Sequence, residues 1–288
     1  MGEAKKQWPD DGVKRIVVTL GPTDETIDDI MKITNMSTGA LGSIIAQTLM
    51  ARASAEKPVE LFLVCNKTAY LINRPALDGL IARGAHLVLI GGVKHGVRVT
   101  SEAQDMLDEL EKLYQNHKID YLFHSAAVGD YVGRYASSAR MLADEIYALY
   151  RQAGAEGFNA EAIADVLRAP KSVFDRDTKM SSDEPDMLVK LGLTPKVIAR
   201  ITGLAKAAGY ETKMISWKLL SGVSEAELLD VALQHGKRNG SYLVVANDLA
   251  QINDGGHKAI ILNVASGEKV VATTKQDIAN KLADAVGL

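Results

Sequence analysis

The chain has 288 residues, of which 47% are hydrophobic and 24% are charged, which is enough to build the core of one large α/β domain. The formal net charge of -3 argues against a nucleic-acid-binding protein, because such proteins hold phosphate groups with many Lys and Arg side chains. The single cysteine, Cys65, excludes a disulfide framework or a thiolate metal cluster within one chain and predicts a reducing, cytoplasmic location.

The first eight residues contain no apolar signal segment. No apolar run approaches the roughly 20 residues that cross a bilayer. We therefore expect neither export nor binding to a membrane.

Predicted strands and helices alternate along most of the chain. Apolar, β-branched runs predict strands, and apolar positions at helical spacing predict helices. This alternation predicts an α/β fold with a doubly wound, mostly parallel Rossmann-like sheet and helices on both faces. The strands are expected at 16–20, 61–64, 86–90, 121–124, 213–217, 242–246 and 259–263, and the main helices at 101–117, 194–208, 225–237 and 275–285.

The polar, glycine-spaced loop at 34–42 leads directly into another predicted helix. Backbone amides at a helix start have no partner within the helix and bind anions. The turn Gly21-Pro22-Thr23, after the first strand, is expected to bring a second stretch of backbone to the same place. The two loops predict a phosphate site, with an ordinary capped helix as the structural alternative.

A third loop, Ser125-Ala126-Ala127-Val128-Gly129-Asp130-Tyr131, follows the strand at 121–124. Open α/β sheets bind ligands at the carboxyl ends of their strands, and the small residues here leave room for one. Asp130 is suited to orient a ribose or a base amine, or to hold a hydrated metal. A helix cap or turn carboxylate is the structural alternative for Asp130.

Between about 132 and 192 the alternation stops. We predict an insertion with a helix at 139–150, a loop at 154–159 and a second helix. Apolar residues around Lys190 and a turn-rich stretch at 181–185 predict a protruding β-hairpin over 179–191. Lys179 precedes it, and a lysine on such a flap is suited to close over a triphosphate, although most single lysines are merely solvated.

Further candidates lie at later strand and helix ends. Thr194-Pro195-Lys196-Val197 begins a helix and exposes amide donors. Trp217 ends a strand, where it could stack on a nucleobase or complete the core. Lys237 and Arg238 lie in the last turn of a helix, where the helix dipole is a sufficient reason for them. Asn247-Asp248 ends the next strand.

Several common catalytic patterns are absent. The sequence contains no H-E-x-x-H, C-x-x-C, G-x-S-x-G or Walker pattern, and the loop after the first strand is no three-glycine dinucleotide fingerprint. Four histidines, His95, His124, His235 and His257, have no metal-ligand spacing. We interpret them as structural or surface residues, and the sequence does not identify the metal ligands.

Taken in order, these motifs resemble phosphopantothenate–cysteine ligase, a coenzyme A pathway family also called phosphopantothenoylcysteine synthetase, in its free-standing bacterial form. The resemblance spans nearly the whole chain and implies a single ligase domain over 1–288 with the inserted helical and flap segment at 132–192. The motifs that carry it are Gly21-Pro22-Thr23, Ile33-Thr34-Asn35 with Ser37-Thr38-Gly39, residues 125–131, Lys179-Met180-Ser181-Ser182 with Thr194-Pro195-Lys196, and Ala246-Asn247-Asp248-Leu249.

The resemblance implies that a nucleoside triphosphate activates the carboxylate of 4'-phosphopantothenate with loss of pyrophosphate, and that the acyl nucleotide then couples to the amine of L-cysteine. CTP is favoured over ATP, Mg²⁺ is expected to accompany the nucleotide, and a homodimer is expected. The partners would be these small molecules, with no nucleic acid and no membrane.

The resemblance also implies roles for individual residues. Asn35 and Lys179 would be catalytic, Asn35 by steadying the acyl nucleotide and Lys179 by neutralising phosphates. The residues expected to bind phosphopantothenate are Gly21, Thr23, Asn35, Ser37, Thr38, Gly39, Gly42, Ala126 and Ala127. Those expected to bind the nucleotide are Ser125, Asp130, Lys179, Thr194, Pro195, Lys196, Val197, Trp217, Lys237, Arg238 and Asn247. The alignment of Lys237 and Arg238 requires a small insertion in the preceding helix.

Two other classes remain open. The alternating elements and Asp130-Tyr131 are compatible with an NAD(P)-dependent reductase, although Arg134 stands near where a tyrosine-x-x-x-lysine pair would need its lysine. A non-catalytic nucleotide-binding or flavin-binding paralogue would keep the same loops without turnover.

Overall fold

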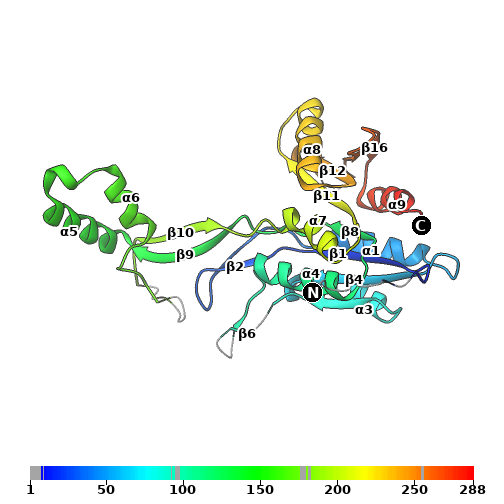
Figure 1. The fold of residues 1–288 in the computed structure, drawn as a ribbon, viewed down its shortest axis with the longest axis horizontal. Coiled ribbons are helices and arrows are strands. Elements are labelled where there is room, and N and C mark those ends of the chain that lie inside the picture. The colour runs from blue at the N-terminus through cyan, green and yellow to red at the C-terminus, as the bar shows by residue number, and fades with distance from the viewer. Residues whose placement is uncertain are drawn as a thin grey trace, which may run out of the picture.

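The structure is a computed structural model that describes residues 8, 10–91, 93–94, 98–175, 180, 183–253 and 256–288. Within these residues an eight-stranded sheet lies between two layers of helices, and an arm of two strands and two helices extends from this body (Figure 1). Among the same residues, no helix combines the length and apolar character needed to span a membrane.

The central sheet is mostly parallel, as the sequence predicts. In spatial order its strands are β16 (Lys269–Ala272), β15 (Ala259–Asn263), β12 (Leu243–Asp248), β11 (Lys213–Leu220), β8 (Tyr121–His124), β1 (Lys14–Leu20), β4 (Val59–Cys65) and β5 (His86–Leu89). The strands from β12 to β5 run parallel, whereas β15 and β16 form an antiparallel edge. From β1 the chain builds outward through β4 to β5, then returns to β8 and builds the other way. The strand order therefore reverses between β1 and β8, which is where open α/β sheets bind ligands.

Helices cover both faces of this sheet. Adjacent residues of β1 point to opposite sides, so that Val18 packs into the cluster with α1 (Ala40–Arg52), α3 (Arg74–Ile81) and α9 (Lys275–Ala285). Val17 packs on the other face with α4 (Ala103–Asn116) and α7 (Val197–Ala207), and α8 (Glu225–Asn239) covers the β12 end of that face. The short helix α2 (Lys67–Ile72) joins β4 to α3. The doubly wound α/β fold is thereby confirmed.

Local sequence signals define the ends of these helices. In α8 the side chain of Ser224 accepts a hydrogen bond from the Glu227 amide, and Gly240 ends the helix with a φ of 67°. Thr274 caps α9 in the same way. In α4, Met106 and Leu110 lie at helical spacing and are fully buried.

Short strand pairs occupy the loops around the sheet. They are β2 (Asp24–Thr26) with β3 (Lys32–Thr34), β6 (Val93–Lys94) with β7 (Arg98–Val99), and β13 (Ile252–Asn253) with β14 (Gly256–His257), and a 3-10 turn covers Leu249–Gln251. The β2–β3 pair stands directly before the loop that leads into α1. It fixes the position from which Asn35 extends.

The arm contains the inserted segment. Strands β9 (Tyr131–Ser138) and β10 (Met187–Leu193) pair antiparallel, and α5 (Ala139–Gly157) and α6 (Ala160–Arg168) lie at the outer end (Figure 1). The protruding strand pair is present, but a tight turn at 181–185 does not join it: the partner of β10 is β9, and both helices lie between them in sequence. The alternation around Lys190 marks a strand without indicating which distant segment pairs with it.

Candidate active site

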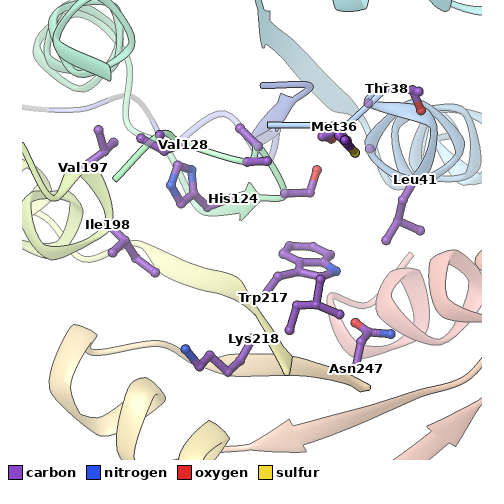
Figure 2. Close-up of a pocket in the computed structure, with 18 of the residues that line it drawn as sticks. Met36, Thr38, Leu41, His124, Val128, Val197, Ile198, Trp217, Lys218 and Asn247 are labelled. Carbon is purple, nitrogen blue, oxygen red and sulfur yellow. The ribbon is translucent and has the colours of Figure 1, made fainter. Parts of the chain in front are cut away.

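A cleft of about 650 Å³ opens at the carboxyl ends of β1, β8, β11 and β12. Figure 2 shows Thr38 and Leu41 on one side of it, Lys218 on the other, and Trp217 between them. The residues predicted from the sequence that line it are Ser37, Thr38, Gly39, Gly42, Ser125, Ala126, Ala127, Asp130, Thr194, Pro195, Lys196, Val197, Trp217 and Asn247. The topological switch point between β1 and β8 thus carries the cleft.

The start of α1 forms one end of the cleft. The N-cap residue of α1 is Gly39, which has no side chain to cap the helix, and its backbone lies in the left-handed region with a φ of 77°. A Cβ atom there would lie 3.0 Å from the backbone nitrogen of Gly21, and one at Gly42 would lie 2.6 Å from Ser125 Oγ. The two loops therefore converge as the sequence predicts, and only glycine permits this approach. The first amides of α1 open into the cleft, where they can hold an anion.

Gly21 and Thr23 support this end from behind and are absent from the cleft lining described here. Thr23 is fully buried: its hydroxyl donates to Glu25 Oε1 at 2.8 Å and accepts from the Gly129 amide at 2.8 Å. A Cβ atom on Gly21 would collide with the Ala69 side chain at 2.3 Å. Both residues hold the loops together, and the direct substrate contact that the resemblance implies for them stays a prediction.

Asn35 is tied to the β8–β9 connection. Its side-chain nitrogen donates to the carbonyls of Ala127 at 3.0 Å and Val128 at 3.3 Å. Because carbonyls only accept, the network itself fixes which end of the amide is nitrogen. Both hydrogens are therefore used, and Asn35 Oδ1 is the atom left to interact with a ligand. Asn35 stands beside the described lining residues rather than among them.

The loop after β8 forms the floor of the cleft. Ser125 Oγ donates to the Thr19 carbonyl at 2.6 Å, so its hydroxyl fixes the loop, while Ala126 and Ala127 leave space. Asp130 forms an ion pair with Lys196 at 2.5 Å, and the two side chains are 68% and 56% exposed. A pair this exposed contributes at most about 1 kcal/mol, so a ligand can replace it cheaply.

The ends of β11 and β12 form the opposite wall. Trp217 carries a buried indole nitrogen without a hydrogen-bond partner among the described residues. Asn247 is buried and donates to the Lys258 carbonyl at 2.9 Å. The predicted basic pair, Lys237 and Arg238, is exposed and lies outside the described cleft lining. His235, from the same helix, lines the cleft instead. Because a residue two or three positions further along an α-helix points in a different direction, Lys237 and Arg238 face solvent while His235 faces the cleft.

Three histidines that the sequence suggests are structural or surface residues line the cleft: His124, His235 and His257. His95 lies outside the described residues. Burial, with a smaller effect of His235, lowers the pKa of His124 to about 4, so its imidazole is neutral at physiological pH. Burial first, and then Lys218 and Arg238, lower the pKa of His235. The sequence did not indicate that these three side chains line the cleft.

Sequence reasoning also missed two cations, Lys218 and Lys275, that line the cleft. Lys218 follows Trp217 at the carboxyl end of β11, and Lys275 is the first residue of α9, so position at strand and helix ends could have marked both. Lys179 lies outside the described residues; the next residue, Met180, donates its amide to Asp28 Oδ2 at 3.2 Å. In the described part of the chain, no three His, Cys, Asp or Glu side chains gather as metal ligands.

Comparisons with known proteins agree with this architecture. The chain is 26% identical over 273 residues to the coenzyme A biosynthesis bifunctional protein CoaBC of Thermococcus kodakarensis, covering 95% of this chain and 51% of that protein. The chain thus spans about half the length of this curated relative. A crystal structure of the DNA/pantothenate metabolism flavoprotein from Streptococcus pneumoniae matches with a TM-score of 0.64 and 26% identity, over 95% of this chain and 97% of that one.

Two more distant structures share the fold. The C-terminal domain of a CoaBC protein matches at 18% identity and a TM-score of 0.54, over 95% of this chain and 93% of its own. A Cab2 mutant in complex with phosphopantothenate-cysteine matches at 16% identity and a TM-score of 0.57, over 94% and 87%. Residues 12–74 match the model of the DNA/pantothenate metabolism flavoprotein C-terminal domain, and the whole chain is similar to a coenzyme A biosynthesis protein.

Proposed function

We propose that this chain is a phosphopantothenate–cysteine ligase of coenzyme A biosynthesis, with CTP as the preferred nucleotide. The observation that carries the proposal is one cleft with two different ends. At one end the start of α1 offers amides to a phosphate, and at the other Trp217 and Asn247 offer a surface to a nucleoside. Similarity to the Thermococcus and Streptococcus proteins over 95% of the chain supports it.

In the first half-reaction, a carboxylate oxygen of 4'-phosphopantothenate attacks the α-phosphorus of the nucleotide, and pyrophosphate leaves. Positioning is the main requirement, because both reactants are anionic and must be held in line. We assign the phosphate of phosphopantothenate to Ser37, Thr38 and the first amides of α1. Ala126 and Ala127 would then lie along its pantothenoyl chain.

In the second half-reaction, the neutral amine of cysteine attacks the acyl carbonyl, the nucleoside monophosphate leaves with the bonding electron pair, and the nitrogen loses one proton to water. Asn35 Oδ1 is suited to accept a hydrogen bond from that amine, because its Nδ2 hydrogens are already used on Ala127 and Val128. We therefore assign Asn35 to orienting cysteine rather than to donating to an oxyanion.

The nucleotide would lie against Trp217, with Asn247, Asp130 and the segment 194–197 around it. The amino group of cytosine or of adenine could donate to Asn247 Oδ1, since Nδ2 is engaged with Lys258. On the resemblance alone, we propose that Lys179 neutralises the phosphates of the nucleotide.

Mg²⁺ would arrive with the nucleotide. Asp130 is the one carboxylate among the described lining residues, and a nucleotide-bound Mg²⁺ takes only one or two protein carboxylates beside phosphate oxygens and waters. The residues present therefore fit such an ion, which would neutralise charge on the phosphates when bound.

We also propose a homodimer assembled through the arm. Large apolar side chains on its two strands are exposed, namely Tyr131, Leu188, Leu191 and Leu193. Exposed apolar side chains gathered in one region are typical of protein interfaces. Sedimentation equilibrium of the whole chain tests this: a monomer at micromolar concentration would contradict it.

The activity test uses purified protein with 4'-phosphopantothenate, L-cysteine, Mg²⁺ and either CTP or ATP at equal concentration. We expect pyrophosphate release and a cysteine-containing amide, measured by mass spectrometry, with CTP turned over faster. Failure to form a cysteine-dependent product with either nucleotide would refute the proposal. Binding of NADPH or a coloured flavoprotein would instead favour the alternatives named above.

A substitution of Asn35 tests its role separately. Asn35→Ala removes an acceptor for the cysteine amine, whose nitrogen becomes positively charged as the C–N bond forms, so we expect the amide-forming step to slow roughly 10- to 100-fold, the effect of one hydrogen bond to a charged group. Pyrophosphate release in a single turnover without cysteine should be nearly unchanged. Equal losses in both steps would remove Asn35 from this role.

A further inference from the structure

Within the described residues, Lys218 is a cation of the cleft without an ion-pair partner. It lies half-buried on β11, and among the described residues no carboxylate forms an ion pair with it. Lys196, also in the cleft, is paired with Asp130. Partial burial of an ammonium group costs free energy unless an anion or other partner compensates it. This position therefore suits a ligand that brings negative charge.

His235 presents a hydrogen-bond donor in the same cleft as Lys218. Its Nδ1 lies 3.4 Å from the side-chain nitrogen of Asn239, which also donates to the His235 carbonyl at 2.9 Å. Since Nδ1 accepts from Asn239, the neutral ring carries its proton on Nε2. That atom is buried and has no partner among the described residues. A buried donor without an acceptor is unfavourable, and a ligand oxygen would satisfy it.

His124 provides a second donor of the same kind. The hydroxyl oxygen of the fully buried Thr19 accepts from the Ala126 amide at 3.2 Å and lies 3.0 Å from His124 Nδ1. Among the described contacts, Nδ1 is the acceptor available to the Thr19 hydroxyl proton. The proton of His124 is therefore on Nε2, and Figure 2 shows the ring on the wall of the cleft. His124 pairs in register with Ser216, two residues before Lys218 on the neighbouring strand, so the side chains of His124 and Lys218 lie on the same face of the sheet.

We propose that Lys218, His235 and His124 form an anion subsite that holds the phosphate chain of the nucleotide. Lys218 supplies the charge and the two Nε2–H groups supply directed hydrogen bonds, with Asp130 the one carboxylate in the described lining. Figure 2 places Lys218 and Thr38 on opposite sides of the cleft, so this subsite is separate from the α1 end. The inference rests on the proposed function, because it assigns a second phosphorylated ligand to the same cleft.

The test compares Lys218→Gln and His235→Gln with Lys237→Gln, a matched change of an exposed lysine outside the described lining. For each of the first two, we expect the KM for CTP to rise at least about tenfold, the loss of one charge-assisted hydrogen bond, while the KM for phosphopantothenate stays within twofold. Lys237→Gln should change neither constant, and Lys218→Arg should restore most of the CTP affinity. An unchanged KM for CTP in Lys218→Gln, or an equal rise in both constants, would overturn the subsite.

Calorimetric titration with inorganic tripolyphosphate separates this inference from the ligase proposal. We expect wild-type and Lys237→Gln proteins to bind tripolyphosphate, and Lys218→Gln to bind at least about tenfold more weakly. Binding that depends on Lys218 in a protein without ligase activity would keep the subsite and reject the ligase. Ligase activity with tripolyphosphate binding that is absent, or indifferent to Lys218, would reject the subsite alone.

Discussion

Acidification should destabilise the folded protein through His124. This residue is 6% exposed, and burial lowers its pKa from 6.5 to about 4. In the unfolded chain the ring takes up a proton as the pH falls through about 6.5, whereas in the folded protein it stays neutral until about 4. A group with a lowered folded pKa contributes stability that is complete above its unfolded pKa and is lost as the pH falls through this window.

The size of the effect follows from the two pKa values. A difference of about 2.5 units corresponds to about 3 kcal/mol when the loss is complete, and to about 2 kcal/mol at pH 5. Urea unfolding of the wild type and of His124→Asn at pH 7.5 and pH 5.0 measures it. The wild type should lose about 2 kcal/mol more than the variant between the two pH values. Carboxylates and the other histidines titrate in both proteins, so the difference isolates His124.

An identical pH dependence in the two proteins would refute the reasoning. It would mean that the folded protein accepts a proton on His124 near neutral pH, and that water or a carboxylate reaches the ring. The argument that a neutral ring directs Nε2–H into the cleft would then fail as well.

Three further changes test the packing around the site. Gly42→Ala should cost about 1–3 kcal/mol in urea unfolding, because the added methyl group would lie 2.6 Å from the Leu20 side chain. The control Gly79→Ala, in a helix with open space around it, should be neutral or stabilising. Thr23→Val should lower the free energy of unfolding by about 1–3 kcal/mol, because it leaves the Gly129 amide without its acceptor. A change near zero would contradict this role of the Thr23 hydroxyl. Cys65 is fully buried and burial raises the pKa of its thiol to about 12, so it should react with a thiol reagent at pH 8 only on unfolding; rapid reaction of the folded protein would contradict this.

The sequence predicts the central strands and most helices because each carries its own signal. β8 and α9 begin and end where the pattern places them, at 121–124 and 275–285, since a buried run or a capped amphipathic helix is defined within a few residues. The partner of β10 is different: β9 lies some fifty residues away, and no local pattern encodes that pairing. Edge strand β16 is also missed, because it is short and mostly exposed.

The site likewise has one part that local sequence signals define and one part that depends on long-range packing. The α1 end was predictable, because its loop, its glycines and its helix start are consecutive in sequence. The opposite end was not, since His124, Lys218 and His235 come from β8, β11 and α8 and meet only through the strand order. The sequence indicated a basic group near the end of α8, but the helical phase that brings His235 to the cleft and leaves Lys237 in solvent depends on packing.

The strand order would also explain how one cleft serves the two phosphorylated substrates proposed above. Because β1 and β8 are neighbours at the reversal of the winding, the helix that follows β1 and the strand ends of β8, β11 and β12 face the same opening from different sides. Anions held at both sides would place the carboxylate of one substrate and the α-phosphorus of the other between the two subsites, with the alanines along the pantothenoyl chain and Trp217 against the nucleoside. Binding energy from two remote phosphates can then be used to bring a carboxylate and an α-phosphorus together against their mutual repulsion. A single anion site could bind either substrate but could not fix the distance between them.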